Sequence, residues 1–350
     1  RCRLHSSMST SAGVRRDAVG VCPSGALGVS VLYHITDGLA NRHAVLMDRP
    51  GSSRRLNAAV RIQAEGAQGV RVAELVDFYS PGTFSELWQR GALPEVVVVL
   101  PNTDQLRDVF RALVELLETM HVASVLTPEL AASSFPVVAL MSNGIFYQQE
   151  MAGFVSMMAT SRALGRLTSL AEKSASGIDL LGAILPKFIR APTVLMGVRV
   201  GSGDEALYRV GPPAPTTLVG GSDEHRLRAR DLLARGTAPI NVEPLGKNPF
   251  ETELQKAQVN LSGNLLGVLA SVGADGRFAA ATWGLCESSE ALAADMFGLA
   301  CAVVSIGRAV GASAYLQTTP TESLGQMKAK LAAFRAHVPS SVQYVQAGLQ

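Results

Sequence analysis

The chain has 350 residues, of which 47% are hydrophobic and 17% charged, so it can bury two cores of ordinary size and two domains are expected. A formal net charge of +2 with scattered basic residues excludes a nucleic-acid-binding stripe and leaves room for an anionic small molecule. Four cysteines without a CxxC pair or zinc-like His spacing exclude a disulfide scaffold and a zinc site, and they indicate a reducing compartment.

The N-terminal segment and the apolar runs bear on location. Residues 1–16 hold four arginines, four serines and no acidic residue, which is typical of a transit peptide remnant or of a disordered basic tail. We therefore expect them to lie outside the fold, in a protein of the cytoplasm or of a plastid or mitochondrion. The missing initial Met indicates a fragment. No stretch reaches 18 uninterrupted apolar residues, so we expect a soluble protein with no membrane partner.

From Ala18 onward, short apolar runs alternate with helical patterns. Four runs without polar alternation are typical of central parallel strands, at residues 18–22, 44–48, 95–100 and 136–141. Segments 26–40 and 104–120 have helical periodicity, and Asp104 is a plausible N-cap of the second. The alternation predicts an α/β fold with a Rossmann-type, doubly wound parallel sheet.

The second half of the chain changes character twice. Residues 152–190 are rich in Met, Ala and Leu and are predicted as a helical insertion. Short strands closed by glycine are then expected to continue the sheet, at 193–200, 206–211 and 216–221, before a charged helix at 222–236. A link with Pro and Gly at 238–249 separates a dinucleotide-binding domain, residues 17–247, from a helical substrate and catalytic domain, residues 248–350.

The first predicted strand runs into the turn "CPSGALG" (22–28), and a helix follows at once. A dinucleotide-binding turn has the pattern GxGxxG at this place; here Pro23 replaces the first glycine, while Gly25 and Gly28 keep the others. Free amides at the helix N-terminus can still bind a phosphate, although an ordinary tight turn is the alternative. The predicted cofactor-binding residues of the turn are Ser24, Gly25, Ala26, Leu27 and Gly28.

Two residues after the second predicted strand bear on the choice of cofactor. An acidic residue there binds the ribose hydroxyls of NAD, whereas an arginine accepts the 2′-phosphate of NADP. Asp48 and Arg49 are adjacent, so the signal is mixed. With Arg54 and Arg55 close by, we favour NADP(H) and include Arg49 in the cofactor site.

The stretch "LQKAQVNLSGN" (254–264) carries Lys256, Asn260 and Asn264 at intervals of four residues. At 100° per residue they drift by about 40° each, so they form one ladder on a helix. The ladder lies at the edge of an apolar stripe predicted to be buried, consisting of Leu254, Ala257, Leu261, Leu265 and Val268. An exposed pair of Glu253 and Lys256 on a solvated helix face is the plain alternative.

Three motifs in this order resemble those of the ketopantoate reductase family (2-dehydropantoate 2-reductase), in the 6-phosphogluconate dehydrogenase-like superfamily. They are "SGALG" after the first strand, "MSNGI" (141–145) after a later one, and K-x-x-x-N-x-x-x-N at 256–264, in a resemblance that spans about residues 18–350. The resemblance implies an NADPH-dependent oxidoreductase of pantothenate biosynthesis that reduces a 2-keto acid, ketopantoate, to pantoate. It implies a soluble monomer or homodimer.

The resemblance also implies roles for single residues. Lys256 becomes the general acid that protonates the carbonyl oxygen, and Asn260 and Asn264 hold the substrate. This agrees with the chemistry, because hydride addition to a ketone builds negative charge on oxygen that a positioned ammonium stabilises and quenches. Asn143 would lie between nicotinamide and substrate, and Ser341 in "VPSSVQ" would bind the substrate carboxylate. From the residues alone, the first could be a tight turn and the second part of an N-cap.

The chain departs from the family pattern at three further points. Pro101 and Asn102 stand where a lysine that touches the cofactor is expected, and Asp275 stands where a substrate asparagine is expected. A glutamate that contacts the cofactor would lie beyond Gln350, which indicates a truncated sequence. Because a carboxylate repels an anionic keto acid, either Asp275 points away or the substrate differs. The competing functions are a related 2-hydroxy acid or opine-type dehydrogenase and a dinucleotide-binding homologue without turnover.

Overall fold

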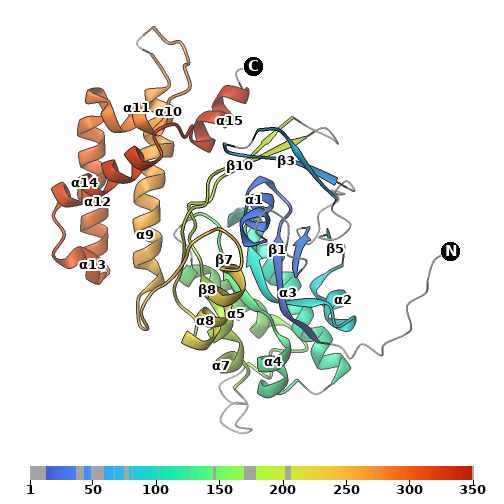
Figure 1. Ribbon diagram of the computed structural model, residues 1–350. Helices are drawn as coiled ribbons and strands as arrows, with labels where there is room; N and C mark the ends of the chain where they lie inside the picture. Colours follow the sequence, from blue (N-terminus) through green and yellow to red (C-terminus); the bar gives the residue numbers. More distant parts are fainter. Residues whose placement is uncertain are drawn as a thin grey trace. The chain divides into compact units, whose positions relative to one another are not determined.

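The computed structural model describes the greater part of the chain, in the ranges 13–36, 43–48, 59–66, 68–74, 79–80, 82–101, 103–124, 126–144, 147–168, 179–201, 206–273 and 275–348. The chain forms two compact units (Figure 1). Unit 1 comprises Arg1–Asn143 and Tyr147–Lys247, and unit 2 comprises Gly144–Phe146 and Asn248–Gln350.

A six-stranded sheet organises unit 1, and all its neighbouring strands are parallel. Its strands in spatial order are β5 (Tyr79–Ser80), β2 (Ala44–Met47), β1 (Val14–Cys22), β6 (Leu93–Val99), β7 (Val137–Leu140) and β8 (Phe188–Arg190). Numbered along the chain within this sheet, the order is 3-2-1-4-5-6, that of the dinucleotide-binding doubly wound fold. The predicted α/β fold class is therefore confirmed, including all four of the central strands.

The first strand begins earlier than the sequence predicts. β1 starts at Val14, and Val14 and Arg15 already pair with β6 before a register shift interrupts the ladder. The prediction that the fold excludes these residues is wrong, because exposed charges hide a genuine strand. Arg16 forms an ion pair with Glu95 of β6 at 3.5 Å, and the hydrophobic pattern becomes visible only from Ala18 onward.

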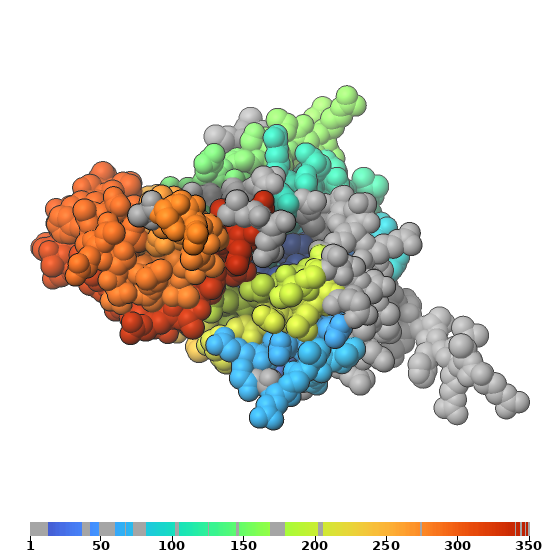
Figure 2. Space-filling model, turned by 90° about the horizontal axis from the view of Figure 1, so that it is seen from above, coloured from blue at the N-terminus to red at the C-terminus, as the bar shows by residue number. Residues whose placement is uncertain are grey.

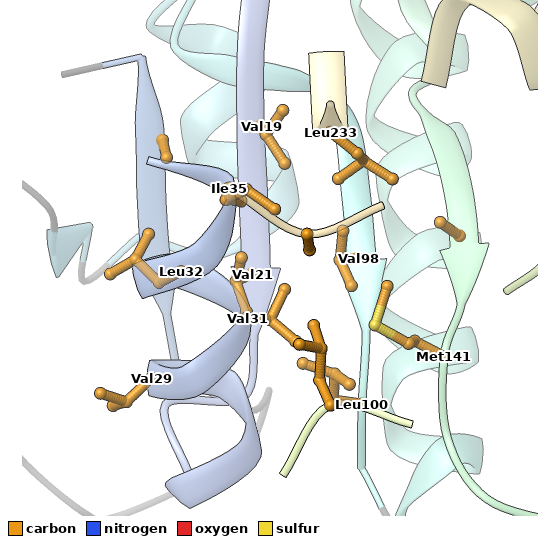
Figure 3. Packing of buried hydrophobic residues seen from close by; sticks show 14 of the residues in the cluster. Val19, Val21, Val29, Val31, Leu32, Ile35, Val98, Leu100, Met141 and Leu233 are labelled. Carbon is orange, nitrogen blue, oxygen red and sulfur yellow. The ribbon is translucent and has the colours of Figure 1, made fainter. Parts of the chain in front are cut away.

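Helices cover both faces of this sheet. On one face, α1 (Ala26–Ile35) and α8 (Asp223–Leu233) pack on alternate residues of β1 and β6, as Figure 3 shows for Val31, Leu233 and Val98. The other face carries α3 (Thr103–Ala123) and α5 (Tyr147–Thr160), whose phenylalanines meet Phe188 of β8. Among the described residues, the remaining helical segments of unit 1 are α2 (Phe84–Gln89), α4 (Pro128–Ser134), α7 (Leu180–Ile184) and η2 (Leu185–Lys187).

Three details of the predicted elements in unit 1 change. α3 begins at Thr103, so Asp104 lies inside the helix and is not its N-cap. The predicted helical insertion contains an edge strand, β8, because Phe188 and Ile189 are fully buried in the sheet. Finally, the short strands after it do not continue the main sheet.

Those short strands build separate sheets. One has the order β4-β3-β10-β9, with the strands Arg71–Glu74, Ala59–Ala64, Leu207–Val210 and Gly197–Val200. In Figure 2 the light-blue surface of β3 and β4 adjoins the yellow-green surface of β9 and β10. A two-stranded sheet joins β11 (Thr216–Leu218) to β12 (Ile240–Val242). The four-stranded sheet covers the outer side of α1, where the Ser30 hydroxyl donates to the Met196 carbonyl at 2.7 Å. Helix α1 is thus held between two sheets, which fixes the direction of its N-terminus.

Unit 2 is helical, as predicted. Its segments are α9 (Pro249–Asn260), η4 (Leu261–Leu265), α10 (Leu266–Ala270), α11 (Trp283–Ser288), η5 (Glu290–Leu292), α12 (Ala293–Ala309), α13 (Ser313–Leu316), α14 (Pro320–Ala333) and α15 (Ser340–Gly348). Segments α9, η4 and α10 form one continuous helical run, in which η4 is a π turn.

By length and composition alone, residues 290–309 could cross a membrane. Within unit 2, however, this segment buries Met296, Val303 and Val304 and packs against α9 and α14. Such contacts are those of a bundle helix, and 33% of the apolar window is buried.

Candidate functional site

The two glycines of the glycine turn differ in the space around them. A Cβ on Gly28 would overlap the carbonyl oxygen of Pro23 and lie 3.1 Å from its carbonyl carbon, so only glycine lets the helix start this close to the turn. A Cβ on Gly25 would meet no atom within 4 Å. Gly25 is the N-cap of α1, and among the described residues no side chain hydrogen-bonds to the cap, so the first amides of α1 lack a side-chain partner there. Such an end suits an anion.

The turn is tied to the end of the second strand. The hydroxyl of Ser24, which is buried, donates to Oδ1 of Asp48 at 2.7 Å, and the Sγ of Cys22 donates to the Asp48 carbonyl at 3.4 Å. Asp48 is half-buried and follows directly after β2, where a ribose-binding carboxylate belongs. Arg49 lies outside the described residues.

Asn143 is exposed and follows the carboxyl end of β7, which is two strands away from the glycine turn in the sheet. The next residue, Gly144, has φ of 130°, a conformation that favours glycine. Ligands of open α/β sheets bind at this edge, near the switch in strand order between β1 and β6. The turn residues 24–28 and Asn143 therefore share the edge expected of a cofactor site.

Sequence reasoning missed the arginine that fixes this edge. Arg190 ends β8, is fully buried, and donates to the carbonyls of Leu140 at 2.6 Å and Ser142 at 2.7 Å. It thereby fixes the chain just before Asn143. A single arginine inside the apolar run "FIRAP" was the only signal in the sequence. Pro101, at the neighbouring strand end, is buried, and Asn102 lies outside the described residues.

The ladder in unit 2 is partly buried, but the buried face beside it differs from the prediction. Lys256, Asn260 and Asn264 are all half-buried. In the predicted buried stripe, Leu254 is 2% exposed, whereas Leu261 is 40% and Leu265 is 53% exposed, so the stripe is wrong beyond the first turns. The buried face instead combines Val259 and Leu266 with small or polar residues: Gln258, Ser262, Gly263 and Gly267.

Other contacts surround the ladder within unit 2. The hydroxyl of Ser341 donates to the main-chain carbonyl of Asn264 at 2.7 Å. His337 stacks edge-on against Trp283 with ring centroids 4.7 Å apart. Burial and, secondarily, the positive charge of Lys256 lower the pKa of His337 to about 4, so its imidazole is neutral at pH 7. The ladder lysine therefore has a neutral neighbour, which sequence reasoning did not identify.

Asp275 lies at the tip of the loop between α10 and α11. Its side chain is exposed; Oδ1 accepts from the amide of Arg277 at 3.0 Å, and Oδ2 is 3.5 Å from that residue's Nε. Its charge is thus matched within its own turn. Among the described residues, no group of three or more His, Cys, Asp or Glu side chains is arranged to hold a metal ion.

No protein-family model and no curated relative matches the chain. Solved structures do match. A dimeric ketopantoate reductase from Staphylococcus aureus has 12% identity and a TM-score of 0.56, over 95% of this chain and 86% of its own. A PanE/ApbA family ketopantoate reductase from Ralstonia eutropha JMP134 has 14% identity and a TM-score of 0.57, over 95% and 86%. D-mandelate dehydrogenase with NADH and anilino(oxo)acetate has 12% and 0.57, over 93% and 84%.

These matches cover both units, and ketopantoate reductases, the proteins whose motifs the sequence resembles, recur among them. At such identities they establish a shared fold, an N-terminal parallel sheet followed by helices. Since one fold hosts many reactions, the reaction must be argued from the residues themselves.

Proposed function

We propose that this protein is an NADP(H)-dependent reductase of a 2-keto acid, with ketopantoate as the substrate and pantoate as the product. The observation that carries the proposal is the half-buried ladder of Lys256, Asn260 and Asn264. A lysine that served only solubility would stand in solvent, and two asparagines in register are unexpected in a helix, where their amides compete with the backbone. The neighbours with this fold include ketopantoate reductases and D-mandelate dehydrogenase.

In this proposal, unit 1 binds the cofactor through Ser24, Gly25, Ala26, Leu27 and Gly28, with Arg49 on the 2′-phosphate and Asn143 at the nicotinamide end. The open N-terminus of α1 supports a pyrophosphate at Gly25, because its amides and dipole favour negative charge. When bound, the reduced cofactor supplies the hydride. Ser24 buttresses Asp48 beside the ribose position, and Arg190 steadies the chain before Asn143.

Unit 2 supplies the proton. The ammonium of Lys256 stabilises the charge that develops on the carbonyl oxygen and then transfers a proton to it. Asn260 and Asn264 orient the keto acid by hydrogen bonds, and Ser341 contacts its carboxylate by turning its proton away from the Asn264 carbonyl. Because His337 is neutral at pH 7, it adds no second cation beside Lys256. The protein acts as a monomer or homodimer in the cytoplasm or an organelle.

Oxidation of NADPH and NADH by purified protein, followed over a panel of 2-keto acids, tests the proposal. We expect ketopantoate to be the best substrate with NADPH, and Lys256→Ala to lower kcat by about 10²–10⁴-fold, the usual contribution of a general acid, with cofactor affinity unchanged. A Lys256→Ala variant as active as wild type would disprove the mechanism. Reduction of another keto acid alone would identify a related 2-hydroxy acid or opine-type dehydrogenase. Tight NADPH binding without any turnover would identify a nucleotide-binding homologue.

A further inference from the structure

The helical run that carries the ladder changes its winding between the two asparagines. The amide of Leu266 donates to the carbonyl of Leu261, five residues earlier, as in a π turn. A π turn advances less per residue than the 100° of an α-helix. Asn260 has drifted about 40° from Lys256, and the wide turn brings Asn264 back toward the side of Lys256. The π turn thus aligns the outer members of the ladder more closely than a regular helix would.

A single aromatic side chain packs against this turn. A Cβ on Gly263 would lie 2.7 Å from Cε2 of Trp283 and closer still to its Nε1, so the indole rests directly on the backbone of the turn. Trp283 also contacts His337, through the ring stacking and through its own amide, which donates to the His337 carbonyl at 2.9 Å. The positive charge of Lys256, after burial, contributes to the lowered pKa of His337. Trp283 therefore touches the turn that carries Asn264 and the neighbour of Lys256.

The indole has no polar role in this position. Nε1 of Trp283 is buried and has no hydrogen-bond partner among the described residues, so its fit against Gly263 is one of shape. In the same turn, the hydroxyl of Ser341 donates to the carbonyl of Asn264 at 2.7 Å. Within the turn, the Ser262 hydroxyl donates back to the Gln258 carbonyl at 2.9 Å. The wide turn is thus held by side chains, with Trp283 as the largest of them.

We propose that Trp283 is a positioning residue for the substrate: its indole, seated on Gly263, maintains the π turn and thereby sets the Asn264 amide relative to Lys256 for a 2-keto acid. This inference rests on the proposed function and adds a determinant of substrate affinity that has no contact with substrate. Single π turns inside α-helices are rare and occur frequently at functional sites, which agrees with such a role.

Gly263→Ala tests the inference, because the added methyl must displace the indole or the turn. Gly307→Ala is the matched control: Gly307 is also a buried helical glycine of unit 2, and its Cβ would lie 2.6 Å from Cβ of Tyr315 and closer still to the ring. We expect both variants to lose a similar amount of Tm. Only Gly263→Ala should raise the KM for ketopantoate, by at least tenfold, while the Kd for NADPH stays within twofold of wild type.

A compensating change sharpens the test. Trp283→Phe removes the indole edge nearest Gly263 without losing a hydrogen bond, so the double variant Gly263→Ala/Trp283→Phe should regain most of the KM lost by Gly263→Ala alone. A purely structural role would move Tm without this reversal of KM. Equal KM values for Gly263→Ala and Gly307→Ala would overturn the inference, as would a double variant no better than Gly263→Ala.

Crystal structures of the two alanine variants separate this inference from the proposed function. We expect the hydrogen bond from the Leu266 amide to the Leu261 carbonyl to be absent in Gly263→Ala and present in Gly307→Ala. If wild type reduces no keto acid, the proposed function fails, and retention of that hydrogen bond in Gly263→Ala would also overturn the role of Trp283. If wild type is active and the bond persists with an unchanged KM, only the role of Trp283 fails.

Discussion

The glycine turn of unit 1 and the π turn of unit 2 both depend on a glycine that another group approaches closely, yet only the first is visible in the sequence. Gly28 lies against the carbonyl of Pro23, between a strand and a helix whose large apolar residues are buried in the core. The apolar pattern on both sides makes this turn recognisable in the sequence. Gly263 lies under an indole, in a helical run whose buried face mixes serine and glycine with Leu266, while Leu261 and Leu265 are exposed. Hydrophobic periodicity locates a core built from large side chains and misses one built by close approach.

The largest expected change in stability comes from substituting two adjacent leucines of unit 2 by alanine, one at a time. Leu266 is 3% exposed and Leu265 is 53% exposed. We expect Leu266→Ala to lower the free energy of unfolding by about 2–5 kcal/mol, the range for a buried leucine, and Leu265→Ala by less than about 0.5 kcal/mol. Urea denaturation measures both. A larger loss for Leu265→Ala than for Leu266→Ala would mean that the predicted stripe, and not the observed face, is buried.

The two glycines of the unit 1 turn give the next largest contrast. Gly28→Ala forces a methyl against the Pro23 carbonyl and should cost about 3 kcal/mol, the upper range of overpacking. Gly25→Ala places its methyl in open space at φ of −74°, so stability should change by less than about 1 kcal/mol.

Gly25→Ala, the variant with the smaller effect on stability, should have the larger effect on cofactor binding. In the proposed site the backbone at Gly25 approaches the pyrophosphate, and a methyl there should weaken NADPH binding at least about tenfold, equivalent to about 1.4 kcal/mol. Calorimetric titration of the folded Gly25→Ala variant checks this. If the folded Gly25→Ala variant binds NADPH with wild-type affinity, the proposal that the pyrophosphate binds at this turn is wrong.

How much of the molecule follows from the sequence depends on what builds each part. The central strands were predictable because their uninterrupted valines, such as Val96–Val99, have no other use than full burial. Val14–Arg16 were not, because their exposed charges carry no apolar pattern. Nor was the second sheet, since its strands are short and the partner of β10 in it, β3, lies more than 140 residues earlier.

The residues of the candidate site also fall into those that the sequence reveals and those that it does not. The residue types of the ladder and of the glycine turn can be recognised from spacing alone. The groups that support them, Arg190, Trp283 and His337, act through burial and contact across distant segments, which single-sequence patterns do not encode. Asp275 illustrates the converse, because its charge raised a doubt about the substrate that its pairing with Arg277 in an exposed loop reduces.

His337 gives unit 2 a pH dependence of intermediate size. Its pKa is lowered from 6.5 to about 4 in the folded chain, so the unfolded chain binds more protons between these values. Stability from this group is present above pH 6.5 and is lost as the pH falls toward 4, by about 2–3 kcal/mol. His337→Asn should therefore flatten the decline in unfolding free energy between pH 7 and pH 4. Parallel declines in wild type and variant would show that His337 titrates normally.

The smallest expected effect concerns Asp48, and it separates charge from structure in unit 1. Asp48→Asn keeps an oxygen that accepts from Ser24 and removes a negative charge beside the proposed ribose position. The ratio of kcat/KM for NADPH over NADH should rise about tenfold, or about 1.4 kcal/mol, with little change in stability. Ser24→Ala is the control: it loses the hydrogen bond, at about 1 kcal/mol of stability, and keeps the charge, so the cofactor ratio should stay constant. If instead Ser24→Ala changes the ratio and Asp48→Asn does not, the hydroxyl and not the carboxylate discriminates between the cofactors. The comparison of the glycine turn of unit 1 with the π turn of unit 2 would then rest on the packing of their glycines alone.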